Sequence, residues 1–150
     1  MRCVETATAV ADLLDVGVKI EPGISEVGTA SHKLLTTAEL AGALPRVDTS
    51  YVPVLAHSDI GPERSDQQAA SRARAAALTV RGRLAGAILF IGHGASCLGL
   101  VSAFGASGYT GYTSLTHFSR AAQTDKWVLQ GEFGSVAHLS DQATARGSAW

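Results

Sequence analysis

The chain has 150 residues, of which 46% are hydrophobic and 17% are charged, so it holds enough material for one globular domain that needs no metal or disulfide to fold. Its formal net charge of -1 leaves no basic excess, which argues against nucleic-acid partners bound through phosphate charge alone. The two cysteines, Cys3 and Cys97, form no CxxC or zinc pattern. Free thiols suit a reducing compartment, so we expect a cytoplasmic protein.

The first half of the chain predicts two helices with a short strand between them. Apolar side chains at helical spacing indicate a helix over residues 2–16, and Gly17 is suited to end it. Alternation over Val18–Glu21 indicates a short strand. A second helix is expected over Thr37–Leu44 with a threonine cap, and a proline-containing loop over residues 45–62.

The second half predicts a long helix and the best strand of the chain. Ser65 and Gln68 have the spacing of a capping box, and a helix with small alanines that can pack close to a sheet follows to Arg83. Ala87–Ile91 is apolar throughout, as expected for a strand buried on both faces of a parallel or mixed sheet. Further on, the patterns predict a helix over residues 96–104, strands over 114–119 and 126–130 with a turn near 124–125, and a loose polar tail over 141–150.

One uncharged stretch, residues 84–109, has the length of a membrane span. It contains a histidine and many glycine and serine residues, and a buried strand, a tight turn and a buried helix account for it better. We therefore expect no membrane partner. Because helices and strands alternate along the chain, the predicted fold class is α/β.

Three side chains indicate a site for an anion. His93 lies in a Gly-His-Gly turn between the best strand and a helix start, where backbone N–H groups and the helix dipole favour negative charge. Arg2 begins the first helix and has the geometry to bind a phosphate through two parallel hydrogen bonds. Glu26 follows the first predicted strand and is a candidate general acid. Together they suggest phosphoryl transfer.

Four segments carry a resemblance to a known family. RCVETA at residues 2–7 is similar to a helix start R-C-x-x-T-A, and IEPGISE at 20–26 is similar to x-E-P-x-L-x-E. ILFIGHG at 88–94 is similar to V-L-V-V-S-H-G, and FGSVAHL at 133–139 resembles a terminal N-D-x-A-H-L. In this order the four segments resemble the histidine phosphatase superfamily, which has the phosphoglycerate mutase-like fold. KIEPGI at 19–24 and VDTSY at 47–51 most resemble one branch, the phosphatase domain of ubiquitin-associated and SH3-domain-containing proteins, with the ecdysteroid-phosphate phosphatases.

The resemblance implies a three-layer sandwich with a mixed, mostly parallel sheet over residues 1–140. It implies that Arg2 clamps a phosphate, that Glu26 protonates the leaving oxygen, and that His93 stabilises the phosphoryl group beside the Gly94 backbone. For His138 we expect a place on the surface or behind the site, with the rim of the site as the alternative. The implied partner is a phosphorylated protein or a small phosphomonoester, with no metal or organic cofactor, and a homodimer is plausible.

The resemblance also exposes a gap. The nucleophile of the family is a histidine in an R-H-G motif after a first strand, and no Arg-His-Gly occurs in this sequence. That strand would lie next to Ala87–Ile91, so its loss would leave an apolar strand edge unpaired. We expect a fragment of a longer phosphatase that is inactive alone. A non-catalytic phosphate-binding or protein-interaction module and a mutase-type phosphotransferase stay open as alternatives.

Other interpretations of the same residues are weaker. A dinucleotide-binding fingerprint would need glycine where Cys97 stands, and a serine hydrolase elbow at Ser96 would need glycine where Leu98 stands. The scattered histidines do not suggest zinc. Tyr51 and residues 52–64 are expected to cap the pocket. The arginines of the second long helix are expected to form a solvated face: Arg72, Arg74, Arg81 and Arg83.

Overall fold

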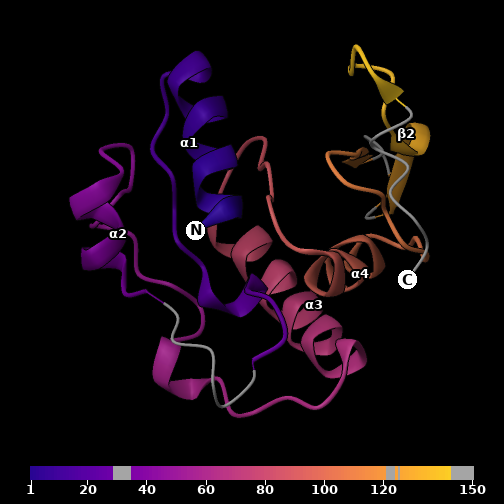
Figure 1. Ribbon diagram of the computed structural model, residues 1–150. Coiled ribbons are helices and arrows are strands. Elements are labelled where there is room, and N and C mark those ends of the chain that lie inside the picture. Colours follow the sequence, from indigo (N-terminus) through magenta and orange to yellow (C-terminus); the bar gives the residue numbers. More distant parts are fainter. Residues whose placement is uncertain (29–34, 121–123, 125, 143–150) are drawn as a thin grey trace.

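The computed structural model describes residues 1–28, 35–120, 124 and 126–142, and they form a mixed α/β arrangement (Figure 1). Helices α1 and α2 lie on one side, the β-hairpin lies on the other, and α3 and α4 cross between them. The predicted helices are confirmed, with each end within two residues of its predicted position. The elements are α1 (Arg2–Leu14), η1 (Pro22–Ile24), α2 (Thr37–Ala43), η2 (His57–Asp59), α3 (Asp66–Arg83), α4 (Gly94–Ala103), β1 (Leu115–Arg120) and β2 (Trp127–Ser135).

Helix α3 is the centre of the core, and it packs most extensively on helix α4 rather than on a sheet. A Cβ atom added to Gly99 of α4 would stand 2.0 Å from the carbonyl oxygen of Ala70 on α3, so the two backbones touch. Such an approach requires glycine on one helix and small side chains on the other. The face of α3 that is buried supplies these: Ala69, Ala70, Ala73, Ala76, Ala77 and Val80.

The helix caps follow the predicted chemistry in part. At α2, the Thr36 hydroxyl accepts from the Glu39 N–H while the Glu39 carboxylate accepts from the Thr36 N–H, a complete capping box. At α3, the Ser65 hydroxyl accepts from the Gln68 N–H at 3.4 Å, as predicted. The Gln68 amide oxygen, however, accepts from the N–H of Arg64 at 2.6 Å, so the predicted box is only half formed.

Two predicted strands are not strands among the described residues. Val18–Glu21 contributes only an isolated parallel bridge between Val18 and Val47. Ala87–Ile91 forms no helix or strand, and its backbone makes no hydrogen bond to another described residue. A strand exists only as part of a ladder, and no described segment is hydrogen-bonded to the backbone of Ala87–Ile91. The predicted mostly parallel sheet is therefore not found in the described part of the chain.

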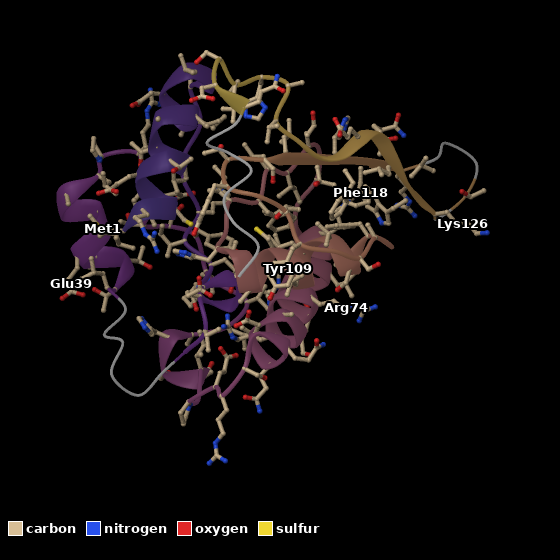
Figure 2. All side chains as sticks on the ribbon, turned by 45° about the vertical axis from the view of Figure 1, so that its right-hand side comes forward. Met1, Glu39, Arg74, Tyr109, Phe118 and Lys126 are labelled. Carbon is tan, nitrogen blue, oxygen red and sulfur yellow. The ribbon has the colours of Figure 1, made fainter. Side chains whose placement is uncertain are left out.

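The sheet that the described residues do form is the antiparallel pair β1–β2. It confirms the two predicted strands near the C-terminal end, although β2 continues to Ser135. Phe104, at the end of α4, contacts Phe118 of β1 and Trp127 of β2 with ring centroids 5.7 Å and 4.9 Å apart. Figure 2 shows Phe118 on the inner part of the hairpin and Lys126 at its outer end. Residue 125 of the predicted turn and residues 143–150 of the predicted tail lie outside the described residues.

None of the helices described in the structure is both long enough and apolar enough to cross a membrane. The uncharged stretch over residues 84–109 instead contains a segment without helix or strand, then helix α4, then a turn at residues 104–105.

Candidate functional site

A cavity of about 700 Å³ lies beneath the apolar face of α1. Two segments without helical structure line it, residues 16–21 and residues 84–91, with Ala85 and Ala87 to Ile91 among its wall. The polar groups in its lining include Glu26, His93 and Tyr51. The face of α1 that lines it is the one that helical spacing singles out: Cys3, Ala7, Val10, Ala11 and Leu14.

His93 is fixed in place by the start of helix α4. It is the N-cap residue, and the hydroxyl of Ser96 both accepts from the His93 N–H at 2.9 Å and donates to the His93 carbonyl at 3.0 Å. Ser96 is fully buried, so it serves as this internal cap and does not face a substrate. A Cβ on Gly92 would stand 2.7 Å from the Ser96 hydroxyl oxygen, which explains the glycine at that position.

The structure brings Glu26 and His93 together, although 66 residues separate them in the sequence. The Glu26 Oε2 atom lies 3.4 Å from Nδ1 of His93, and Glu26 Oε1 accepts from the Val27 N–H at 3.0 Å. Burial lowers the pKa of His93, Glu26 opposes that shift, and the charges of Arg2 and of the N-terminal amine add to it. The arrangement presents a carboxyl group and an imidazole to the same cavity.

The other predicted site residues have different positions. Arg2 is exposed at the first position of α1 and does not line the cavity, although its charge contributes to the lowered pKa of His93. Gly94 begins α4, and the space where a Cβ would stand is open. His138 is exposed in the turn after β2 and is not part of the cavity lining. Of the predicted set, Glu26 and His93 are the two in contact.

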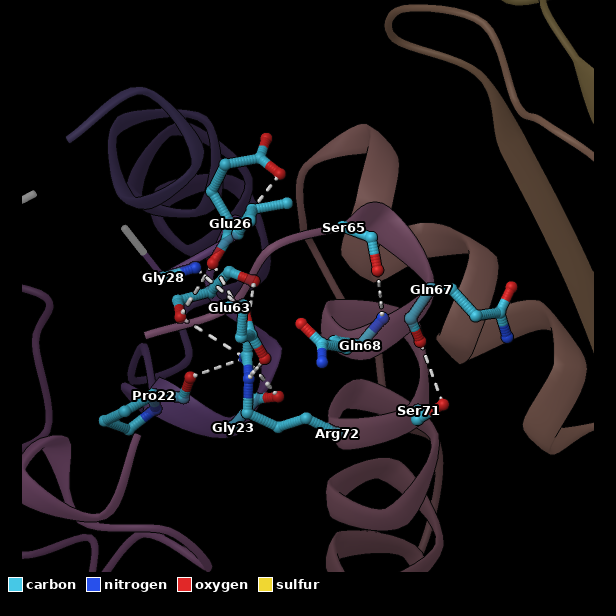
Figure 3. Close-up of polar contacts among 12 residues, drawn as sticks. Pro22, Gly23, Glu26, Gly28, Glu63, Ser65, Gln67, Gln68, Ser71 and Arg72 are labelled. Atoms are coloured by element: carbon cyan, nitrogen blue, oxygen red, sulfur yellow. Dashed lines mark hydrogen bonds and ion pairs between the residues drawn. The ribbon is translucent and has the colours of Figure 1, made fainter. Parts of the chain in front are cut away.

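Arg72 is not on a solvated face, which corrects the prediction for this residue. Its side chain is only 10% exposed and reaches from α3 into the loop that carries Glu26 (Figure 3). There it donates to the carboxylate of Glu63 and to carbonyl groups of the loop. The missed signal is its spacing, since Arg72 stands three residues after Ala69 and four before Ala76 on the buried face of α3.

Glu21 is a second buried anchor that the sequence pattern did not single out. Its carboxylate accepts from the N–H groups of Gly23, Val54 and Leu55 and from the hydroxyl of Tyr51. Burial and the Glu21 carboxylate both raise the pKa of Tyr51. This network ties the segment after Tyr51 to the segment before Glu26. The cavity lining includes Tyr51 and, from the loop predicted to cap the pocket, His57.

The described residues contain no group of three or more His, Cys, Asp or Glu side chains arranged to hold a metal ion. Cys3 and Cys97 are free thiols, and burial is the main cause of the raised pKa of each. The groups that meet where α4 begins are the Glu26 carboxyl group, the His93 imidazole and the N-terminus of that helix.

Comparison with known proteins gives one family. A family model described as the histidine phosphatase superfamily (branch 1) matches residues 1–138. That match covers nearly the whole chain and includes all four resembling segments up to His138. No curated protein compared with the chain matches it.

Proposed function

The chain belongs to the histidine phosphatase superfamily (branch 1), and we propose that its Glu26–His93 pair forms part of a phosphoryl-group site of a phosphomonoester hydrolase. The observation that carries the proposal is the meeting of the two side chains at the start of α4, beside a cavity. The first-turn N–H groups of α4 have no intrahelical partners, and with the helix dipole they favour a bound anion.

Each side chain has a chemical task in this proposal. His93 donates a hydrogen bond to a phosphoryl oxygen, and the Gly94 backbone lies open to a second oxygen. Glu26 gives a proton to the leaving oxygen as the bond between phosphorus and that oxygen breaks. Arg2 balances the negative charge of the phosphoryl group. No metal or organic cofactor takes part.

The covalent step of such a reaction needs a nucleophile. In the resembled family a histidine nitrogen attacks phosphorus, and water then releases phosphate from the phosphohistidine. The sequence holds no Arg-His-Gly motif. We therefore expect the chain alone to bind phosphate or vanadate without turning over a phosphomonoester, and we assign full turnover to a longer protein that supplies the nucleophile.

Calorimetric titration with phosphate and orthovanadate tests the site. We expect binding that is lost in His93→Ala and retained in His117→Ala, because His117 is exposed on β1. Absence of binding to the unaltered chain would count against the phosphoryl site. A parallel assay with p-nitrophenyl phosphate is expected to show no turnover, and turnover abolished by His93→Ala would contradict the expected inactivity.

A second candidate function, a non-catalytic phosphate-binding module, is favoured by the missing motif. The two proposals share the anion site and differ in whether an upstream strand with Arg-His-Gly restores turnover. Reconstitution with such a segment separates them, since only the phosphatase fragment gains activity. Free thiols at Cys3 and Cys97 support a cytoplasmic setting for either function.

We also propose that Val18–Glu21 and Ala87–Ile91 are strands of a three-layer sandwich in the complete domain. In support, the backbone of Ala87–Ile91 makes no hydrogen bond to another described residue. The bridge to residues 46–48 uses the N–H and C=O of Val18. Because successive residues of an extended segment point to opposite sides, the N–H and C=O of Lys19 point away from that bridge.

A further inference from the structure

We propose that Arg72, together with Glu63, is the positioning pair that holds Glu26 against His93. The inference rests on the proposed function only in treating Glu26 and His93 as a reaction site, and the pair has its own test. Arg72 lies on α3, Glu63 precedes that helix, and both reach the loop that carries Glu26 (Figure 3). Neither residue is itself part of the cavity lining, so they act through Glu26 and its loop.

The Arg72 guanidinium engages all three of its nitrogen atoms. Nε and Nη2 donate to the two carboxylate oxygens of Glu63 at 2.8 Å each. Nη1 donates to the carbonyls of Pro22 and Gly23 at 3.2 Å and 2.9 Å. Nη1 and Nη2 also contact the hydroxyl and the carbonyl of Ser25, both at 3.3 Å. An arginine has five N–H donors in a fixed planar fork, and lysine has no equivalent.

We call the Arg72–Glu63 pair the clamp, and it fixes the backbone on both sides of the Glu26 side chain. Arg72 Nη2 donates to the Glu26 carbonyl at 3.1 Å. Beyond it, the Gly28 N–H donates to Glu63 at 2.8 Å, and the Glu63 N–H donates to the Gly28 carbonyl at 2.6 Å. With the loop held on each side, the Glu26 carboxylate is directed to Nδ1 of His93.

The charges of the clamp are withdrawn from solvent. The Arg72 and Glu63 side chains are 10% and 11% exposed. The hydrogen bond from Arg72 lowers the pKa of Glu63, so the carboxylate stays charged at neutral pH. An enclosed, charged, bidentate pair holds its geometry far better than an exposed ion pair, and breaking one member leaves the other uncompensated.

The pKa of His93 reports whether the Glu26 carboxylate lies beside it. The groups whose charges act on His93 are Glu26, Arg2 and the N-terminal amine of Met1, and Glu26 is the one that raises its pKa. If the clamp is released and Glu26 moves away, the pKa of His93 falls. A residue that only supports the fold would not change the pKa through Glu26 in particular.

The test is an NMR titration of the His93 imidazole in the full chain. We expect Arg72→Lys and Glu63→Gln each to lower the pKa of His93 toward the value found in Glu26→Gln. Arg74→Lys is the matched control, because Arg74 is exposed on the same helix and should leave the pKa unchanged. When Arg72→Lys is combined with Glu26→Gln, we expect no further fall.

Two outcomes would overturn the inference. One is a folded Arg72→Lys or Glu63→Gln variant whose His93 pKa matches that of the unaltered chain. The other is a fall that persists in full on the Glu26→Gln background. If Arg72→Lys does not fold by circular dichroism, Glu63→Gln decides the question alone. If the unaltered chain does not bind phosphate, the proposed function is wrong, but the role of Arg72 and Glu63 in positioning Glu26 is unaffected.

Discussion

A single buried carboxylate, Glu21, accounts for much of the loop structure beside the cavity. It accepts four hydrogen bonds, three of them from backbone N–H groups. Glu21→Gln places an NH₂ group against these donors and leaves some of them unpaired. We expect it to lower the free energy of unfolding by about 1–3 kcal/mol. Urea unfolding measures this, with the exposed Glu5→Gln as control. Equal stability of the two variants would contradict the assigned role.

The lowered pKa of His93 predicts a dependence of stability on pH. Burial is the main cause of the shift, so the unfolded chain binds the proton more readily than the folded chain. The contribution of His93 is therefore present above the ordinary pKa of 6.5 and is lost as the pH falls below that value. Urea unfolding at pH 5 and pH 8 should show a smaller difference in His93→Gln than in the unaltered chain. An unchanged difference would mean that His93 titrates normally.

The sequence predicts those residues of the site that lie in a recognisable motif, but not how they meet. His93 follows from a Gly-His-Gly turn before a helix, and Glu26 from its loop, but only the fold brings the two within 3.4 Å. Four neighbouring arginines predict a solvated face because arginine is a common surface residue, and Arg72 departs from that prediction. Its spacing from the buried alanines was the overriding signal. The family's role for Arg2 stays a prediction.

At the scale of elements, the contact of α3 with α4 depends on one glycine. Gly99→Ala would place a methyl group 2.0 Å from the Ala70 carbonyl oxygen, so the helices must separate. We expect a loss of about 1–3 kcal/mol in the free energy of unfolding. The control is Gly42→Ala in α2, where nothing lies within 4 Å. That change should stabilise by about 0.5–1 kcal/mol, because alanine is the better helix former.

Chemical denaturation of the two glycine variants measures this contrast. Loss of stability in both, or in neither, would contradict the close crossing of α3 and α4. The helices themselves were predictable because caps and apolar spacing are local. The two strands of the β1–β2 hairpin were predictable as well, because they are neighbours in the sequence. The parallel sheet was not, because the pairing of a segment such as Ala87–Ile91 depends on a neighbour that local sequence does not specify.

At the scale of the whole molecule, the core and the cavity wall should differ in protection. The amides of Ala87–Ile91 make no hydrogen bond to another described residue, whereas those of α3 lie in a helix within the core. Hydrogen–deuterium exchange should therefore be much faster in peptides covering residues 87–91 than in peptides covering residues 69–80. Equal protection would show that the segment has a hydrogen-bonded partner in solution.

Helix α1 is held to the rest of the described chain more firmly near its last turn than along its length. Near its last turn, Arg46 binds Asp12 and Asp15. Along its length it has no extensive contact with another helix or strand of the described chain, and its apolar face borders the cavity. Thirteen residues give a rod of about 20 Å, with the Arg46 anchor at one end and Arg2 at the other. If the helix rotates about this anchor, the Arg2 end moves furthest, and the distance between the Arg2 charge and His93 changes with it.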